Sequence, residues 1–277
     1  MEVEKTLFID DRYDSYESFF DHDWAKVISS QVTGTPLEAA VFNVCLQWKG
    51  TANTLRLPWL MVEGIRSFAN GMCASYEPET AKFLSALRHR LVGELGEKEL
   101  RNMQRRNLQA ALDRICKNVG DGLRDSHEQF DSNQLWHEFL PSSEFRLSVW
   151  SSQQLGYSAV YFAYEDFVRS CVQLAKHDPE FDATGNALAN AIKACFGDVT
   201  LQRCWEHRAV TIARRTRNAL VHNGGKMNEK LAVLQPTYRI ESGMIQLTPG
   251  DTHLLFDELK MRTSELVAAT LVVLSAK

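Results

Sequence analysis

Residues 203–226, RCWEHRAVTIARRTRNALVHNGGK, decide how the second half of this chain folds. The stretch has the pattern of a helix that ends at His222, because the following Asn223-Gly224-Gly225 tolerates the left-handed backbone that closes a helix. We therefore expect His222 in the last helical turn. Apolar residues recur at roughly helical spacing and predict a face turned toward a core: Leu201, Trp205, Ile212, Thr216 and Leu220.

The same stretch concentrates positive charge in a chain whose net charge is −4. Residues 203–230 contain seven Lys or Arg against two Glu, and residues 82–117 contain nine basic residues against four acidic ones. The first 25 residues show the opposite balance, with eight acidic and two basic residues. A polyanion would therefore meet selected faces of the protein rather than a general positive field.

The string Arg217-Asn218-Ala219-Leu220-Val221-His222 resembles the R-N-x-x-x-H signature of HEPN domains. These domains are compact α-helical bundles found in RNA-cutting toxins and antiviral effectors, and the family spaces its arginine and histidine by four to six residues. Arg217 fits with four intervening residues, whereas Arg215 fits with six. The resemblance covers about residues 145–277, and residues 1–140 resemble no named family.

The resemblance implies a metal-independent endoribonuclease, with Arg217, Asn218 and His222 as the catalytic residues. It also implies that an acidic residue on an earlier helix approaches the arginine. Tyr164-Glu165-Asp166-Phe167 is similar to that element, so Glu165 is either a supporting residue that orients Arg217 or an ordinary surface carboxylate. Arg215 is a second supporting candidate, and Arg214 and Lys226 are expected to bind RNA.

The motif residues suit cleavage of RNA, which carries its own nucleophile in the 2′-hydroxyl. A histidine can transfer the protons near neutral pH, and an arginine offers fixed donors to phosphate oxygens. Arg217 and His222 are five positions apart in the sequence. On an ideal helix their side chains therefore project in directions that differ by about 140°. Either the helix end is distorted, or two chains build the site together. HEPN enzymes characteristically dimerise with these helices adjacent, which favours a homodimer.

Other interpretations of the motif remain open. A histidine and arginines near a helix C-terminus are favourable through the helix dipole alone. The alternative function is a non-catalytic HEPN binding or dimerisation module that pairs with a nucleotidyltransferase or another partner protein. A third interpretation is an RNA-binding adaptor that uses the basic region 82–117. A toxin-type effector would also have a separate antitoxin or regulatory protein.

Composition favours a folded, cytoplasmic protein. Of the 277 residues, 44% are hydrophobic, which is enough for a core. The six cysteines contain no C-x-x-C pair, so we expect buried, reduced thiols, no metal site and no cofactor. Neither a signal peptide nor a membrane-spanning segment is expected, because the N-terminus is acidic and the longest apolar run is short.

The pattern predicts a mainly α-helical protein in two parts, residues 1–140 and a HEPN-like domain of residues 141–277. An acidic residue, Asp21 or Asp23, would start a short helix near the N-terminus. Further helices are expected from Thr35, from Pro58, from Pro78 to Gly93 and over 97–119, then over 151–176 and 185–196. We expect Asp198 or Thr200 to cap the signature helix. After that helix we expect a hairpin within 237–247 and a last helix that begins after Pro249-Gly250-Asp251.

An aromatic stripe marks the predicted helix over 151–176. Tyr157, Tyr161, Tyr164 and Phe167 recur at helical spacing, which is typical of a core or a dimer interface more often than of a base-stacking platform.

Overall fold

The computed structural model describes residues 13–96, 106–107, 109–111, 113–115, 117–118 and 131–276. The chain divides into two compact units, one made of residues 1–59 with 139–277 and the other of residues 60–138. The predicted mainly helical fold is confirmed. The second break lies between Glu138 and Phe139, whereas the sequence predicted a single boundary at residue 140, and residues 1–59 belong to the unit of residues 139–277 rather than to that of residues 60–138.

The first unit begins with a short 3-10 helix, η2 (Tyr13–Tyr16), and helix α1 (His22–Val32). Asp21 caps α1, because its carboxylate accepts the N–H of Trp24 at 2.9 Å. Helix α2 (Glu38–Leu55) follows and buries one side, which includes Val41, Val44 and Trp48. Aromatic rings from this part of the chain surround Phe256 of the last helix, including Phe19 between η2 and α1 and Trp48 of α2, each with its ring centroid 5.2 Å from that of Phe256.

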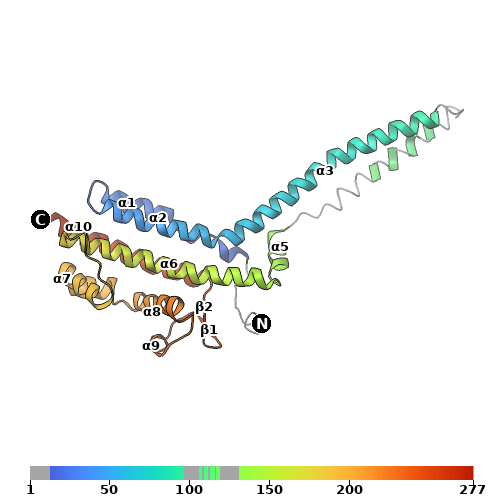
Figure 1. The fold of residues 1–277 in the computed structure, drawn as a ribbon. Helices are drawn as coiled ribbons and strands as arrows, with labels where there is room; N and C mark the ends of the chain where they lie inside the picture. Colours follow the sequence, from blue (N-terminus) through green and yellow to red (C-terminus); the bar gives the residue numbers. More distant parts are fainter. Residues whose placement is uncertain are drawn as a thin grey trace. The chain divides into compact units, whose positions relative to one another are not determined.

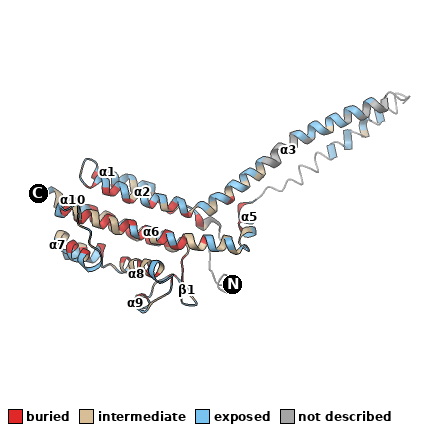
Figure 2. Cartoon of the chain, in the orientation of Figure 1, coloured by how far each residue is buried: buried red, intermediate tan, exposed pale blue. Residues whose placement is uncertain are grey.

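Helix α6 (Ser143–Lys176) is the centre of the first unit, with α1 and α2 on one side of it and α7 and α8 on the other (Figure 1). Its buried residues face these neighbours, while exposed residues lie on the outer sides of the surrounding helices (Figure 2). The Trp48 indole donates to the backbone oxygen of Val160 at 2.9 Å, which links α2 to α6. The aromatic stripe of Tyr157, Tyr161 and Tyr164 is buried here, so it belongs to the core.

The signature stretch forms parts of two helices, α7 (Gly185–Cys204) and α8 (Arg208–His222). The expectation that Asp198 or Thr200 caps the signature helix is wrong. Gly197, with φ +83°, kinks α7, and the helical chain then breaks between Cys204 and Arg208. Asp198 instead forms an ion pair with Lys193 at 2.8 Å.

The chain after α8 forms a short helix, α9 (Glu229–Ala232), and then the predicted hairpin. Strands β1 (Arg239–Glu241) and β2 (Met244–Gln246) pair antiparallel, with Ile240 opposite Ile245. The last helix, α10 (Pro249–Ser275), begins with a capping box in which Thr248 and Asp251 satisfy each other's backbone N–H groups. Helix α10 packs along α6 and α7.

The second unit contains most of helix α3 (Leu57–Gly96) and helix α5 (Ser132–Phe139). The sequence predicts two helices where α3 is one, since Pro78 removes only one helical hydrogen bond and the helix continues on both sides. Glu63 joins α3 to α5, because it accepts the Ser132 hydroxyl at 2.6 Å and pairs with Arg66 at 2.7 Å. The helix expected over 97–119 lies largely outside the described residues.

Candidate active site at the end of α8

Hydrogen bonds fix the short segment of chain between α7 and α8. The N–H groups of Trp205 and Glu206 both donate to the Leu201 oxygen, at 3.0 and 2.9 Å, and this closes α7. His207 caps α8, because its Nδ1 accepts the N–H of Ala209 at 3.3 Å. Trp205 is buried, and the Arg214 guanidinium lies 4.8 Å from the centre of its ring. This cation–π contact holds Arg214 against the start of its own helix.

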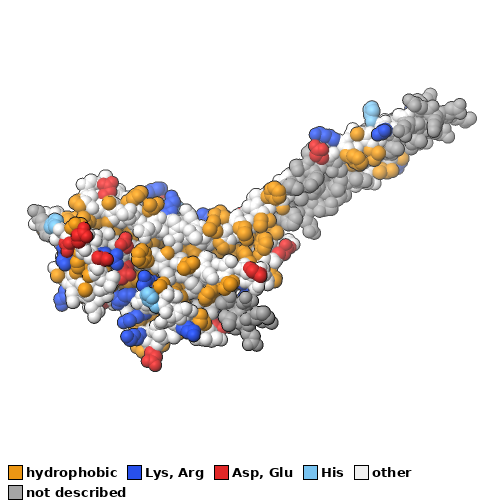
Figure 3. All heavy atoms as spheres, viewed as in Figure 1, with side chains coloured by type: hydrophobic (Ala, Val, Ile, Leu, Met, Phe, Trp, Pro, Cys, Tyr) orange, Lys and Arg blue, Asp and Glu red, His pale blue; other side chains and the backbone are white. Residues whose placement is uncertain are grey.

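The outward face of α8 carries the polar residues of the motif. Val210, Ala213, Thr216 and Ala219 are buried, which fixes the rotation of the helix. Lys and Arg side chains gather over α8 and the segment that follows it on the face shown in Figure 3. The motif side chains are half-buried except for His222, which is exposed: Arg214, Arg215, Arg217, Asn218 and His222.

Arg217 and Asn218 contact each other, whereas His222 stands alone at the helix end. The Arg217 Nη1 donates to the Asn218 Oδ1 at 3.1 Å. Within the part of the chain that the structure describes, the His222 side chain has no hydrogen-bond partner. Asn218 and His222 are one turn apart, so an incoming phosphodiester group could meet both from the same side.

The helix remains regular up to the motif histidine. The N–H groups of Asn223 and Gly225 both donate to the Ala219 oxygen at 3.0 Å. Gly224 and Gly225 have φ values of +59° and +79°, the left-handed conformation that the sequence predicts for this stop. A distorted helix end therefore does not bring the arginine toward the histidine. Arg217 and His222 leave α8 about 140° apart, as ideal helix geometry requires.

Glu165 lies in the electrostatic environment of the arginines without touching them. Burial raises the pKa of the Tyr161 hydroxyl, the charge of Glu165 raises it further, and the charges of Arg214 and Arg217 act in the opposite direction. All three charges therefore act on one buried hydroxyl. Among the described residues, Glu165 forms no ion pair within 4.0 Å. Over the part of the chain that the structure describes, no hydrogen bond or ion pair joins Glu165 to Arg217, so the expected orienting contact is absent from this chain.

The hairpin positions Lys226 beyond the helix end. Ile245 donates its N–H to the Gly225 oxygen at 2.9 Å, and Met227 donates to the Gly243 oxygen at 2.8 Å. Lys226 lies between these two bonds, forms an isolated bridge with Met244 and remains exposed. The hairpin therefore holds a positive side chain close to the C-terminal end of α8.

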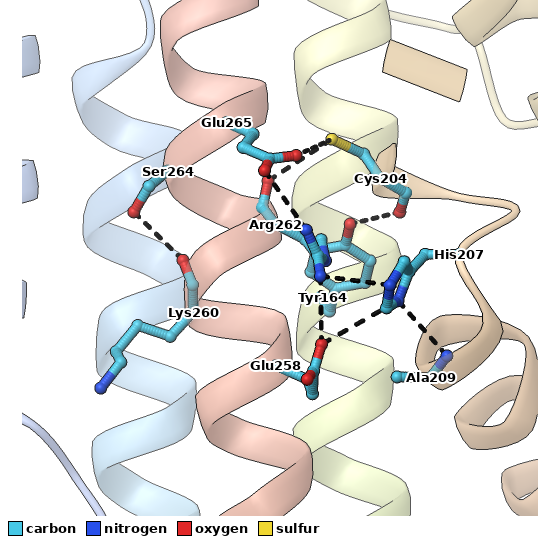
Figure 4. A network of polar contacts seen from close by, with 9 residues as sticks. All are labelled: Tyr164, Cys204, His207, Ala209, Glu258, Lys260, Arg262, Ser264 and Glu265. Atoms are coloured by element: carbon cyan, nitrogen blue, oxygen red, sulfur yellow. Dashed lines mark hydrogen bonds and ion pairs between the residues drawn. The ribbon is translucent and has the colours of Figure 1, made fainter. Parts of the chain in front are cut away.

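Sequence reasoning missed a polar network at the opposite end of α8 (Figure 4). Arg262 of α10 pairs with Glu258 and Glu265, each at 3.2 Å, and its Nη2 lies 3.3 Å from His207 Nε2. The hydroxyl of Tyr164 donates to the backbone oxygen of Cys204. The i, i+4 spacing of Glu258 and Arg262 and the i, i+3 spacing of Arg262 and Glu265 on α10 could be read from the sequence. The contact between Arg262 and His207 could not, because these residues are 55 positions apart.

A pocket of about 500 Å³ adjoins this network, but its polar groups serve the fold. Arg208 donates to the Leu234 oxygen at 2.8 Å, and Asp251 belongs to the capping box of α10. Glu258 is paired with Arg262, as described above. Because these lining groups already have partners within the chain, the candidate active site remains at the C-terminal end of α8.

Two features are absent from the described residues, a metal-binding cluster and a membrane span. In the described ranges, no group of three or more His, Cys, Asp or Glu side chains is arranged to hold a metal ion. Over the same ranges, no helix has the length and apolar character needed to cross a membrane.

Comparison with known proteins identifies no relative of this chain. No protein-family model matches the chain, and no curated protein and no solved structure matches it either. The resemblance to HEPN domains therefore depends on the motif residues and on the helix that carries them.

Proposed function

We propose that this protein is a metal-independent endoribonuclease of HEPN type, an effector of the toxin or antiviral-defence class. The observation that carries the proposal is the end of α8, where exposed His222 lies one turn from Asn218 and follows half-buried Arg217. These groups occupy a positively charged surface that could meet a phosphodiester backbone.

The reaction requires three tasks from the protein. The 2′-hydroxyl must lose its proton, the charge on the phosphorus-bound oxygens must be stabilised, and the leaving 5′-oxygen must gain a proton. We assign proton transfer to His222 and charge stabilisation to Arg217, while Asn218 holds Arg217 through their 3.1 Å hydrogen bond. The 2′-oxygen forms a bond to phosphorus as the 5′-oxygen departs, so the products are a 2′,3′-cyclic phosphate and a 5′-hydroxyl.

The regular geometry of α8 supports a site shared by two chains. Arg217 and His222 point about 140° apart within one helix, so they do not face the same phosphate in one chain. A homodimer with two α8 helices adjacent would place Arg217 of one chain opposite His222 of the other. Isologous contact would then create two equivalent sites.

Arg214 and Lys226 are assigned to binding RNA rather than to the chemistry. Both lie near the motif, and neither of their side chains has a carboxylate within 4.0 Å in the described part of the chain. Binding through phosphate contacts predicts affinity that falls as salt rises, and removal of either charge should reduce the salt slope by about one.

The proposal is tested by incubating purified protein with mixed RNAs in EDTA and mapping the cut ends. We expect cleavage that leaves cyclic phosphate, and loss of about 10²–10⁴-fold in rate for His222→Ala. Arg217→Ala should have a comparable effect, and Arg217→Lys should rescue poorly because lysine lacks the planar fork. Lys230→Ala removes an exposed charge outside the motif and is the matched control.

Two outcomes would redirect the assignment. If Arg215→Ala abolishes cleavage and Arg217→Ala does not, the family spacing of six residues applies instead of four. If none of these changes alters cleavage, the ribonuclease proposal fails. The second candidate is then a binding or dimerisation module, which is favoured by the engagement of Arg217 with Asn218 instead of with His222.

A further inference from the structure

The second unit carries an open groove with positively charged walls along helix α3. The groove has a volume of about 820 Å³, and its lining residues are all exposed: Lys82, Ser85, Ala86, His89 and Arg90. Lys82, Ser85 and His89 follow one another at successive turns of the helix, so a chain laid along α3 would meet a polar side chain about every 5.4 Å. The groove lies outside the HEPN-like region of residues 141–277.

The charges of this unit are accessible to an incoming anion. Lys82 pairs with Glu79 at 3.5 Å, but the two side chains are 76% and 73% exposed. Because such an exposed pair is weak, a phosphate can replace the Glu79 carboxylate beside Lys82. The described part of residues 106–118 belongs to the same unit and contains one acidic residue and three exposed positive ones: Arg106, Arg114 and Lys117.

Two exposed apolar residues adjoin the groove. Phe83 is 65% exposed and Leu87 is 43% exposed, and their spacing of four positions places them on one face of α3. Figure 3 shows hydrophobic, histidine and positive side chains together on the surface of this unit. On the face of Phe83 and Leu87, Glu79 comes one turn earlier and Arg90 about one turn later. This apolar stretch is therefore too short for a seam between two helices, which requires several heptads.

A positively charged groove beside an exposed aromatic ring is the combination that binds single-stranded nucleic acid. We propose that single-stranded RNA binds along this surface of α3, with its phosphates at Lys82 and Arg90 and a base stacked on Phe83. The bases of a duplex are already stacked, so a duplex offers no free base to Phe83. This inference rests on the proposed ribonuclease function and deepens it, because it assigns binding of the substrate to residues outside the motif.

Fluorescence anisotropy of the full chain with a labelled, single-stranded 2′-O-methyl RNA tests the charged contacts. This probe lacks the free 2′-hydroxyl that the proposed cleavage requires, so binding is measured whether or not the protein is a ribonuclease. We expect Lys82→Ala and Arg90→Ala each to reduce the slope of log affinity against log salt by roughly 0.7–1. Lys49→Ala, which removes an exposed charge from α2, is the control and should leave the slope unchanged.

Phe83→Ala tests the stacked base separately from the charges. We expect the affinity for the single-stranded probe to fall at least about fivefold. The salt slope and the thermal midpoint should not change, because the ring is uncharged and mostly exposed. Phe42→Ala is the matched control, since Phe42 of α2 is 62% exposed, and it should keep the wild-type affinity. A duplex of the same sequence should bind more weakly than the single strand.

The outcomes separate this proposal from the ribonuclease proposal. An unchanged salt slope in both charge variants would overturn RNA binding by α3, even if the protein cleaves RNA. Unchanged affinity for Phe83→Ala, or equal binding of the duplex, would overturn the stacked base and the preference for single strands. If Phe83→Ala lowers the sedimenting mass and leaves RNA affinity unchanged, the surface is a protein interface instead. Binding that depends on Lys82 and Phe83 in a protein that cleaves no RNA would support this site while the ribonuclease proposal fails.

Discussion

Asp21 shows how one carboxylate can stabilise two distant parts of the chain. Its Oδ1 accepts the Trp24 N–H at 2.9 Å and caps α1, while its Oδ2 pairs with Lys260 of α10 at 3.0 Å. The hydrogen bond from Trp24 is the main reason that the pKa of Asp21 lies below its ordinary value, and Lys260 lowers it further. Folding therefore favours the charged form of this carboxyl group.

Asp21→Ala should lower the free energy of unfolding by about 1 kcal/mol at pH 7, the usual contribution of an N-cap. Because the folded pKa is depressed, the stabilisation is fully present above the ordinary value of 3.8 and is lost as pH falls through the folded value. Urea unfolding at pH 7 and pH 3 should show the difference between wild type and variant shrinking. Asp21→Asn should lower the free energy of unfolding less than Asp21→Ala does, since asparagine also caps helices. The same difference between wild type and Asp21→Ala at both pH values would contradict the role of the charged carboxylate.

The cysteines provide a second prediction for single residues. Burial raises the pKa of the Cys171 thiol to about 12 and that of Cys45 to about 11. The thiolate is the reactive form, so native protein at pH 8 should be alkylated slowly at both positions. Mass spectrometry after iodoacetamide treatment, with and without denaturant, measures this difference. Equal labelling of native and denatured protein would contradict the buried position of Cys171 and the half-buried position of Cys45.

At the scale of helices, the contact between α2 and α6 depends on a glycine. A Cβ atom at Gly156 would lie 2.6 Å from both terminal methyl groups of Leu55 and 2.8 Å from its Cγ. Leu55 is itself buried, so it has little room to move. The close approach of the two helices therefore requires the absence of a side chain at position 156.

Gly156→Ala should lower the free energy of unfolding by about 1–3 kcal/mol, the typical cost of overpacking, reduced by the better helix propensity of alanine. Gly50→Ala in α2 is the control, because no atom lies within 4 Å of its added Cβ. It should raise stability by roughly 0.5–1 kcal/mol. Thermal unfolding followed by circular dichroism compares the two, and a stabilised Gly156→Ala variant would show that the interface is looser than described.

Local signals predicted several elements from the sequence. The hairpin within residues 237–247 and the end of α8 at Asn223-Gly224-Gly225 were both predicted, because turns and helix stops depend on neighbouring residues. The break before α8 could not be predicted in this way. It depends on burial of Trp205 and on the capping role of His207, and neither residue is a typical helix breaker.

The pairing of helices that lie far apart in the sequence could not be predicted from local sequence patterns either. Helix α2 pairs with α6 across about a hundred residues of intervening chain, through contacts such as that between Trp48 and the Val160 oxygen. The periodicity of Tyr157, Tyr161 and Tyr164 predicted the buried face of α6, but it carried no information about the helix that packs against that face. For the candidate site, the spacing predicted that Arg217 and His222 diverge, and the regular α8 retains that divergence.

At the scale of the whole molecule, we propose that the protein is a dimer formed through the outward face of α8. The buried stripe of Tyr157, Tyr161 and Tyr164 is not accessible to a second chain. Val221, one turn from Arg217, is 53% exposed and belongs to the outward face of α8. Contact between two such faces would bury this side chain.

Val221→Glu should therefore weaken the dimer without unfolding the chain. Sedimentation of the wild type at micromolar concentration should give about twice the chain mass of 31.5 kDa, and the variant should move toward the monomer mass. Val233→Glu is the control, because Val233 is 81% exposed and lies outside α8. If the wild type is monomeric, or if only the control variant dissociates, the proposed interface is wrong.

We propose that Arg217 of one chain and His222 of the other complete each ribonuclease site. Mixing inactive Arg217→Ala protein with inactive His222→Ala protein, under conditions that exchange subunits, tests it most directly by RNA cleavage in EDTA. Each mixed dimer would contain one intact site, so an equal mixture should recover about one quarter of the wild-type rate. If subunits exchange and the mixture remains as inactive as its components, while wild type cleaves RNA, the two residues do not act across the dimer.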